Sequence, residues 1–153
     1  MTTAAKTRQE LMRQLAELRG RLAKHRIRDT PDYAEVLVAE ALEGDRVPNG
    51  VNQGYDINSP RYGRIEVKCR VLPTDGRLEE RVDIGNTKAD GFDYLAIVIF
   101  YPDYSVKGAV LVPYSEVWRV IDSRKYRRIS YGEACQLESV VDVTEPVSAA
   151  SQR

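Results

Sequence analysis

The sequence predicts an α/β domain, with a mixed β-sheet flanked by helices and a basic helix at the N-terminus. Leucines recur with helical spacing between residues 7 and 24, whereas residues 94–100 (YLAIVIF) form the continuous apolar run of a strand buried on both faces. Helical and strand patterns alternate along the chain around this run. With 153 residues, the chain is long enough for one domain with a substantial core but too short for two.

The N-terminal segment, residues 1–28, is predicted to form a basic helical arm. Its apolar seam has the alternating steps of four and three residues that coiled coils use, and consists of Leu11, Leu15, Leu18 and Leu22. Eight Lys or Arg and only two Glu lie in this arm, although the net charge of the whole chain is zero. The seam predicts either packing against the body or pairing with a second subunit in a homodimer, and the pattern alone leaves both open.

The first half of the body is predicted to contain a helix and two short strands. The helix covers residues 30–44, because it starts with Thr-Pro and ends with Gly. A turn with a short strand around it is expected at 46–53. Two strands then follow near 54–58 and 63–72, joined by the turn sequence SPRYG. The polar segment 72–93 is expected to be a loop that contains a short helix.

The second half of the body is predicted to complete the sheet. The buried apolar run is followed by a strand at 105–113 and by a helix at 113–126 that starts with Pro. A last strand is expected near 137–143, and residues 146–153 are expected to form a flexible tail. The body is therefore predicted to span residues 29–145.

Composition removes several classes of function. Cys69, Cys135 and His25 are the only Cys and His residues, so the usual zinc sites and His-dependent hydrolytic centres cannot be assembled within one chain. The first residues lack the apolar core of a signal peptide, and no run is long enough to span a bilayer. We therefore expect a cytoplasmic protein with free thiols and no membrane partner.

The strand near 63–72 carries an unusual set of charges. Side chains alternate between the two faces of a strand, so Ile65 and Val67 are predicted on the apolar face and Glu66 and Lys68 on the other. If the preceding strand pairs with it through the short turn, Asp56 joins the charged side. Two neighbouring carboxylates repel each other unless a cation lies between them, and oxygen ligands suit a hard divalent ion such as Mg²⁺.

These residues resemble the motif of the PD-(D/E)XK nuclease superfamily, which has an acid in a first helix, an Asp on a strand and an acid-any-Lys triplet on the next strand. In this sequence the motif reads YAEVLVAEAL, GYD and IEVK, and the resemblance covers roughly residues 31–112. It implies a restriction-endonuclease-like fold and a metal-dependent endonuclease acting on DNA. Tyr55 stands where the family name has a proline, a position that is loose in the family.

The resemblance also implies roles for individual residues. Asp56 and Glu66 would bind Mg²⁺, or Mn²⁺ as a substitute, and the backbone carbonyl of Val67 would add a ligand. Lys68 would assist the attacking water. These four positions form the predicted centre of the site.

Other roles are less closely tied to the motif. Glu35 is expected to be the helix acid, because it follows a small residue early in the helix, and Glu40 competes with it for that role. Arg70 and Lys88 are expected to contact phosphates.

Alternative interpretations remain open from the residues alone. The charges on the strand would also fit a solvated face, and Asp56 would also fit a turn cap. A second functional class is an inactive module of the same fold that binds nucleic acid, or mediates assembly, through its basic helix. The target sequence and the choice between DNA and RNA are not encoded in any visible motif.

Overall fold

The computed structural model describes residues 2–48, 54–85 and 91–153 of the chain. The helices in this part are α1 (Thr3–Lys24), α2 (Asp29–Ala41), α3 (Tyr114–Ile121), α4 (Tyr131–Cys135) and α5 (Thr144–Ala150). The strands are β1 (Asp45–Arg46), β2 (Ile57–Ser59), β3 (Gly63–Val71), β4 (Arg81–Asp83), β5 (Tyr94–Phe100), β6 (Val106–Pro113), β7 (Arg128–Ser130) and β8 (Val141–Asp142).

The described strands build one mixed sheet of six strands, in the order β1-β2-β3-β5-β6-β8, and a separate pair formed by β4 and β7. Strands β3 and β5 run parallel, with Glu66 opposite Leu95 and Lys68 opposite Ile97, and all other pairs are antiparallel. The parallel pair is possible because the long segment between β3 and β5 returns the chain to the same end of the sheet. The predicted α/β architecture with a mixed, helix-flanked sheet is confirmed.

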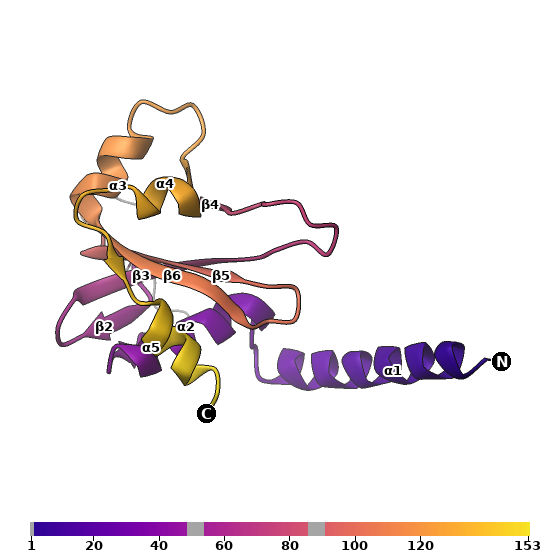
Figure 1. Ribbon diagram of the computed structural model, residues 1–153. Coiled ribbons are helices and arrows are strands. Elements are labelled where there is room, and N and C mark those ends of the chain that lie inside the picture. The colour runs from indigo at the N-terminus through magenta and orange to yellow at the C-terminus, as the bar shows by residue number, and fades with distance from the viewer. Residues whose placement is uncertain (1, 49–53, 86–90) are drawn as a thin grey trace.

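Helices cover both faces of this sheet (Figure 1). Helices α2 and α5 pack on one face, where Ile65 and Val67 of β3 join the core, and α3, α4 and the β4–β7 pair cover the other face. Six residues of β5 are buried because this strand lies in the middle of the sheet with helices on both sides. The prediction that YLAIVIF forms a strand buried on both faces is therefore confirmed.

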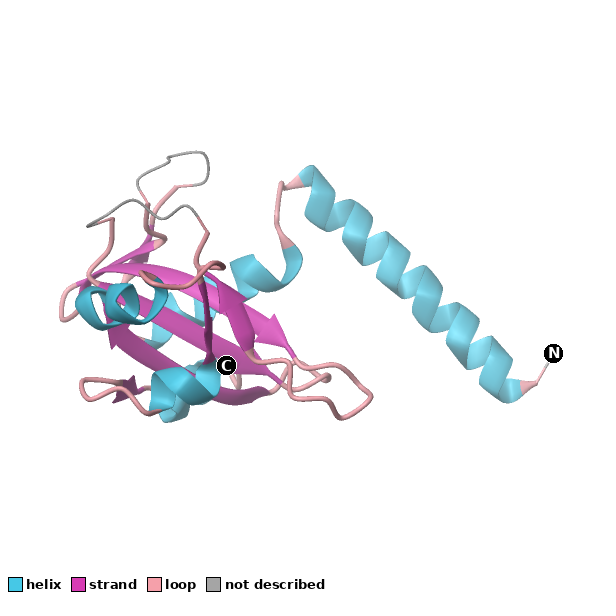
Figure 2. Cartoon of the chain, turned by 90° about the horizontal axis from the view of Figure 1, so that it is seen from above, coloured by secondary structure: helices cyan, strands magenta, loops and turns pink. Residues whose placement is uncertain are grey.

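Helix α1 projects away from the body in both views of the chain (Figures 1 and 2). It contains no buried residue, and Leu15 and Leu18 of its apolar seam are 50% and 49% exposed. The predicted basic helix is thus present, but the structure does not pack its seam into the core of the body. No helix among the described residues is both long and apolar enough to cross a lipid bilayer.

Three expectations for the secondary structure need correction. The tail expected to be flexible instead forms α5, because Val147 and Ala150 are buried against the first core face. The last strand is shorter than expected, since β8 comprises only two residues and follows the short helix α4. The described part of segment 72–93 contains β4 and no helix, because Val82 packs into the second core face while β4 pairs with β7.

Candidate active site

The candidate site lies where β2 separates from β3. Strand β2 pairs with β3 only over residues 63–65, and beyond this point the side chain of Asp56 takes over as the partner of β3. The backbone N–H of Val67 donates a 2.8 Å hydrogen bond to Oδ2 of Asp56, and the N–H of Asp56 donates one of 2.8 Å to the carbonyl of Ile65. In a strand, the N–H and C=O of one residue point to the same edge, so the carbonyl of Val67 faces the edge occupied by Asp56.

The turn before β3 fixes this arrangement. Gly63 has a φ of 76°, in the left-handed region that favours glycine, and a side chain at this position would collide with Asp93. Asp93 in turn accepts the backbone N–H of Arg64 at 2.8 Å. The SPRYG turn therefore sets the register in which Ile57 lies opposite Ile65. This register determines which residues of β3 lie beside Asp56.

Glu35 reaches the same edge from α2. Its residue exposure is 5%, and its carboxyl lies within hydrogen-bonding reach of that of Asp56. Glu40, the competing helix acid, is on the exposed part of α2 and pairs with Arg153 at 3.1 Å. The structure thus brings Glu35, and not Glu40, beside Asp56.

Glu66 and Lys68 lie on the face of β3 opposite to the one from which Ile65 and Val67 pack against α2. Their side chains form an ion pair with 3.5 Å between Nζ and Oε1, and they are 16% and 32% exposed respectively. Glu66 also interacts with Asp56, and both carboxyls feel the charge of Lys68. Carboxylates from α2, the segment before β2, and β3 therefore meet around one edge of the sheet, with a single lysine alongside. We call Glu35, Asp56 and Glu66 the acidic cluster.

Every carboxyl of the acidic cluster has a raised pKa. Burial is the main cause in each case, since it removes water from the charged form. For Glu35, burial and the neighbouring Asp56 raise the pKa to about 7, although Arg46 acts in the opposite direction. For Asp56, the charge of Glu66 adds to burial, whereas the Val67 N–H and Lys68 oppose it. Burial therefore favours the protonated form of each of these carboxyls, most strongly where Asp56 and Glu35 face each other.

Two arginines that the sequence analysis missed bind the buried side of the cluster. Arg46 donates to Glu35 at 2.6 Å and to Asp32 at 3.1 Å, and Arg28 contacts the same two carboxylates at 3.2 and 2.9 Å. Hydrogen bonds from Arg28 outweigh burial and lower the pKa of Asp32. The spacing of four residues between Arg28 and Asp32 is a helix-pair signal visible in the sequence. The contribution of Arg46 depends on the tertiary fold and had no such signal.

The side chains of the acidic cluster are chemically suited to a hard divalent cation. All their ligand atoms are oxygens, and burial leaves their negative charge poorly solvated. No group of three His, Cys, Asp or Glu side chains in the described residues is arranged as a ready-made metal site. Glu35 instead accepts hydrogen bonds from Arg28 and Arg46, Asp56 accepts the Val67 N–H, and Glu66 pairs with Lys68.

Of the two residues predicted to contact phosphates, Arg70 and Lys88, the structure describes only Arg70. Arg70 lies on the same face of β3 as Glu66 and Lys68, is exposed, and contacts Glu79 at 3.6 Å. Lys88 lies outside the described residues. Arg70 therefore extends the charged face of β3 beyond the acidic cluster.

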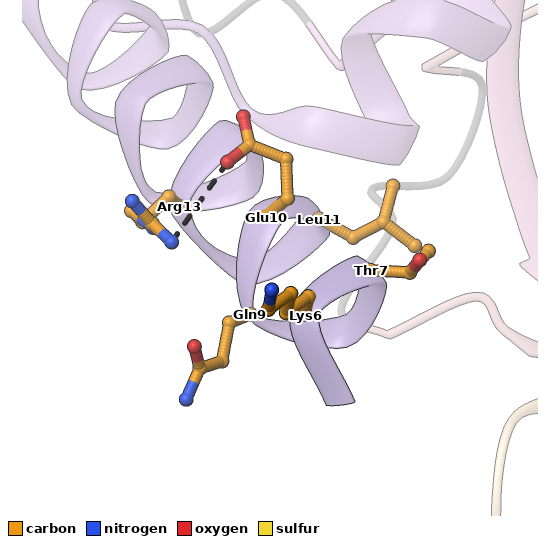
Figure 3. Close-up of a pocket in the computed structure, with 6 residues that line it drawn as sticks. All are labelled: Lys6, Thr7, Gln9, Glu10, Leu11 and Arg13. Atoms are coloured by element: carbon orange, nitrogen blue, oxygen red, sulfur yellow. Dashed lines mark ion pairs between the residues drawn. The ribbon is translucent and has the colours of Figure 1, made fainter. Parts of the chain in front are cut away.

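A hollow of about 600 Å³ lies on α1, apart from the acidic cluster (Figure 3). All six residues that line it come from one helix, and the ion pair drawn there joins Glu10 and Arg13 at 3.9 Å. Because its lining comes from a single exposed helix, the hollow has no second wall that could enclose a small ligand.

No protein-family model matches the sequence of the chain, and none of the curated proteins does so. The geometry of the acidic cluster and the motif in the sequence are the features that point to a function.

Proposed function

We propose that the protein is a Mg²⁺-dependent nuclease that hydrolyses phosphodiester bonds in DNA. The observation that carries this proposal is the convergence of Glu35, Asp56 and Glu66, all with raised pKa values, beside Lys68 at the open edge of β3. Buried carboxylates that repel one another destabilise a fold unless a cation offsets their charge. A divalent cation is the partner that this set of oxygen ligands fits best.

The chain's own residues have distinct roles in this proposal. Asp56 and Glu66 would hold the ion together with the carbonyl of Val67, and Glu35 would be the further carboxylate of the site. Lys68 orients the attacking water and offsets the charge that develops on the phosphoryl oxygens. A bound Mg²⁺ would polarise the phosphate and lower the pKa of its bound water. Mn²⁺ would serve as a substitute, because it also accepts carboxylate and carbonyl oxygens.

A restriction-endonuclease-like fold is part of the proposal. It is supported by the mixed sheet with helices on both faces and by the placing of the motif residues on α2, before β2 and on β3. The position of Asp56 beside the acid-any-Lys triplet is the feature that the sequence resemblance requires. The cytoplasmic location inferred from the sequence stays a prediction.

Cleavage of plasmid and linear DNA, with Mg²⁺ or with EDTA, tests the proposal. Wild type should cleave with Mg²⁺ only, and Lys68→Ala should lower the rate by at least about 100-fold. Lys107→Ala is the matched control, because Lys107 also forms a half-buried ion pair, at 2.9 Å from Glu80, but lies outside the cluster. Equal cleavage by wild type and Lys68→Ala, or cleavage that persists in EDTA, contradicts the nuclease proposal.

A second candidate is an inactive module that binds nucleic acid through α1. This alternative is favoured by the absence of buried residues in α1 and by its basic composition. A truncation should remove residues 1–25 only, since Arg28 contacts Asp32 and Glu35. Loss of DNA binding on truncation, together with calorimetry that detects no Mg²⁺ binding, supports the module and contradicts the nuclease.

A homodimer through α1 accompanies either function. Leu15, Leu18 and Leu22 line an apolar groove of about 600 Å³ that continues over Val36 and Tyr104 of the body. A second copy of the seam would cover this groove and the exposed Leu11 in one step. A dimer also supplies two active sites, which suits cleavage of both strands of a duplex.

A further inference from the structure

Two hollows on the body each have basic side chains as at least half of their lining residues. One, of about 380 Å³, includes Arg70, Arg81 and Arg128 in its lining. The other, of about 340 Å³, shares Arg81 and Arg128 and adds Arg124 and Lys125. We call these five residues the arginine surface.

The arginine surface continues the charged face of β3. Glu66, Lys68 and Arg70 alternate along this strand on one face, which separates neighbouring side chains by about 6.6 Å. Beyond Arg70, the β4–β7 pair supplies Arg81 and Arg128 from adjacent strands. A polymer that crosses the acidic cluster along β3 would therefore meet the arginine surface next.

Some cations of the arginine surface have no carboxylate partner among the described residues. Glu79 contacts Arg70 at 3.6 Å, Glu133 forms a two-pronged ion pair with Arg124, and Asp83, the third carboxylate of the two hollows, accepts the N–H of Gly85. For the three remaining cations, no ion pair with any described carboxylate is formed; these are Arg81, Lys125 and Arg128.

Aromatic contacts hold two of these cations in position. Lys125 and Arg128 lie over the ring of Tyr126, at 5.5 and 5.4 Å from its centre. Such stacking leaves the donor groups of a guanidinium available at its edge and reduces the entropy lost when it binds a ligand. The arginine surface therefore presents positioned cations that can bind an anion.

We infer that the arginine surface binds the phosphodiester backbone of the nucleic acid next to the cleavage site. The identity of the polymer rests on the proposed function. The acidic cluster repels a phosphate backbone on either side of a bound ion, so the backbone has to be held by cations nearby. Guanidinium groups match phosphate oxygens with paired hydrogen bonds, and contacts of this kind fix position without reading sequence.

Binding of a fluorescent DNA duplex tests the inference, with the full chain carrying Lys68→Ala and with Mg²⁺ present. The double variant Arg81→Gln/Arg128→Gln should raise Kd by about tenfold or more and reduce the slope of log K against log salt concentration by about two. Arg61→Gln/Arg153→Gln is the matched control, because it removes two exposed arginines that line neither hollow. Circular dichroism verifies that each variant is folded.

The outcomes separate this inference from the proposed function. An unchanged Kd and salt slope in Arg81→Gln/Arg128→Gln, or an equal loss in the control, overturns the inference, and Mg²⁺-dependent cleavage by the wild type would then still support the nuclease. A selective loss of binding supports the inference, even if the wild type cleaves no DNA and the nuclease proposal fails. Absence of DNA binding in the Lys68→Ala chain overturns the inference.

Discussion

The backbone N–H of Val67 donates a 2.8 Å hydrogen bond to Oδ2 of Asp56, where β2 ends its pairing with β3. A carboxylate thus occupies the position that a strand carbonyl would otherwise take in the ladder. The backbone of β3 orients Asp56 before any ligand arrives, because the Val67 N–H would be left without this partner if the side chain turned away. The same edge presents the Val67 carbonyl, so two of the proposed metal ligands are positioned by one strand.

This contact predicts different results for two substitutions of Asp56. Asp56→Asn keeps an oxygen that can accept the Val67 N–H, so thermal stability should change little while cleavage falls by about 100-fold or more because the charge is lost. Asp56→Ala removes the acceptor as well and should destabilise the fold by about 1–3 kcal/mol. Melting curves and cleavage rates are measured on both variants. Normal cleavage by Asp56→Asn contradicts the proposed role.

The two helix acids predict a paired comparison. Glu35→Gln should reduce cleavage by about tenfold or more, because Glu35 lies beside Asp56, whereas Glu40→Gln should leave the rate within about twofold of wild type. Both variants remove one negative charge from α2, so Glu40→Gln controls for helix charge. Equal rates for the two variants would remove Glu35 from the site.

Binding of Mg²⁺ should release protons near neutral pH. The carboxyls of Glu35, Asp56 and Glu66 have raised pKa values, and a divalent cation binds their ionised forms. Calorimetric titrations at about pH 7 in two buffers of different ionisation enthalpy should therefore give different apparent heats. Asp56→Asn should show no binding heat. Identical heats in both buffers contradict proton release from the cluster.

Stability in EDTA should fall as pH rises. The pKa of Glu35 increases from 4.5 to about 7 on folding, so the folded protein binds more protons than the unfolded chain between these values. The free energy of unfolding should decrease across this window, by at most about 3 kcal/mol from Glu35. Urea unfolding at several pH values measures it.

Two variants control this experiment. Glu35→Gln should flatten the pH dependence, since the amide does not titrate, and Glu40→Gln should preserve it. A wild-type stability that falls no more steeply with pH than that of Glu35→Gln contradicts a raised pKa of Glu35.

The seam of α1 predicts a change of oligomeric state. Leu15→Glu/Leu18→Glu places two charges on the apolar groove and should convert a dimer to a monomer in light scattering. Arg8→Gln/Arg13→Gln alters the charge of the same helix away from the groove and should leave the dimer intact. A wild-type chain that is monomeric at every concentration measured contradicts the homodimer proposal.

The sequence alone predicted the main elements that carry the site. Strict alternation in β3 separated Ile65 and Val67 from Glu66 and Lys68, because the period of a strand allows only two faces. The unbroken apolar run of β5 predicted burial on both sides. The C-terminal helix was missed because only two of its residues are buried, Val147 and Ala150, so its apolar pattern is too short to distinguish from a tail.

The tertiary structure decided which charges meet. The sequence pattern favoured Glu35 over Glu40 as the helix acid only by its earlier place in the helix, and the packing of α2 against β3 brings Glu35 toward Asp56 and leaves Glu40 with Arg153. Arg46 comes to Glu35 from the short strand β1, a contact that no periodicity could predict. The sequence by itself determined the types of residue available at the edge of β3. Their raised pKa values required the fold, because burial and the distances between charges are properties of the packed chain.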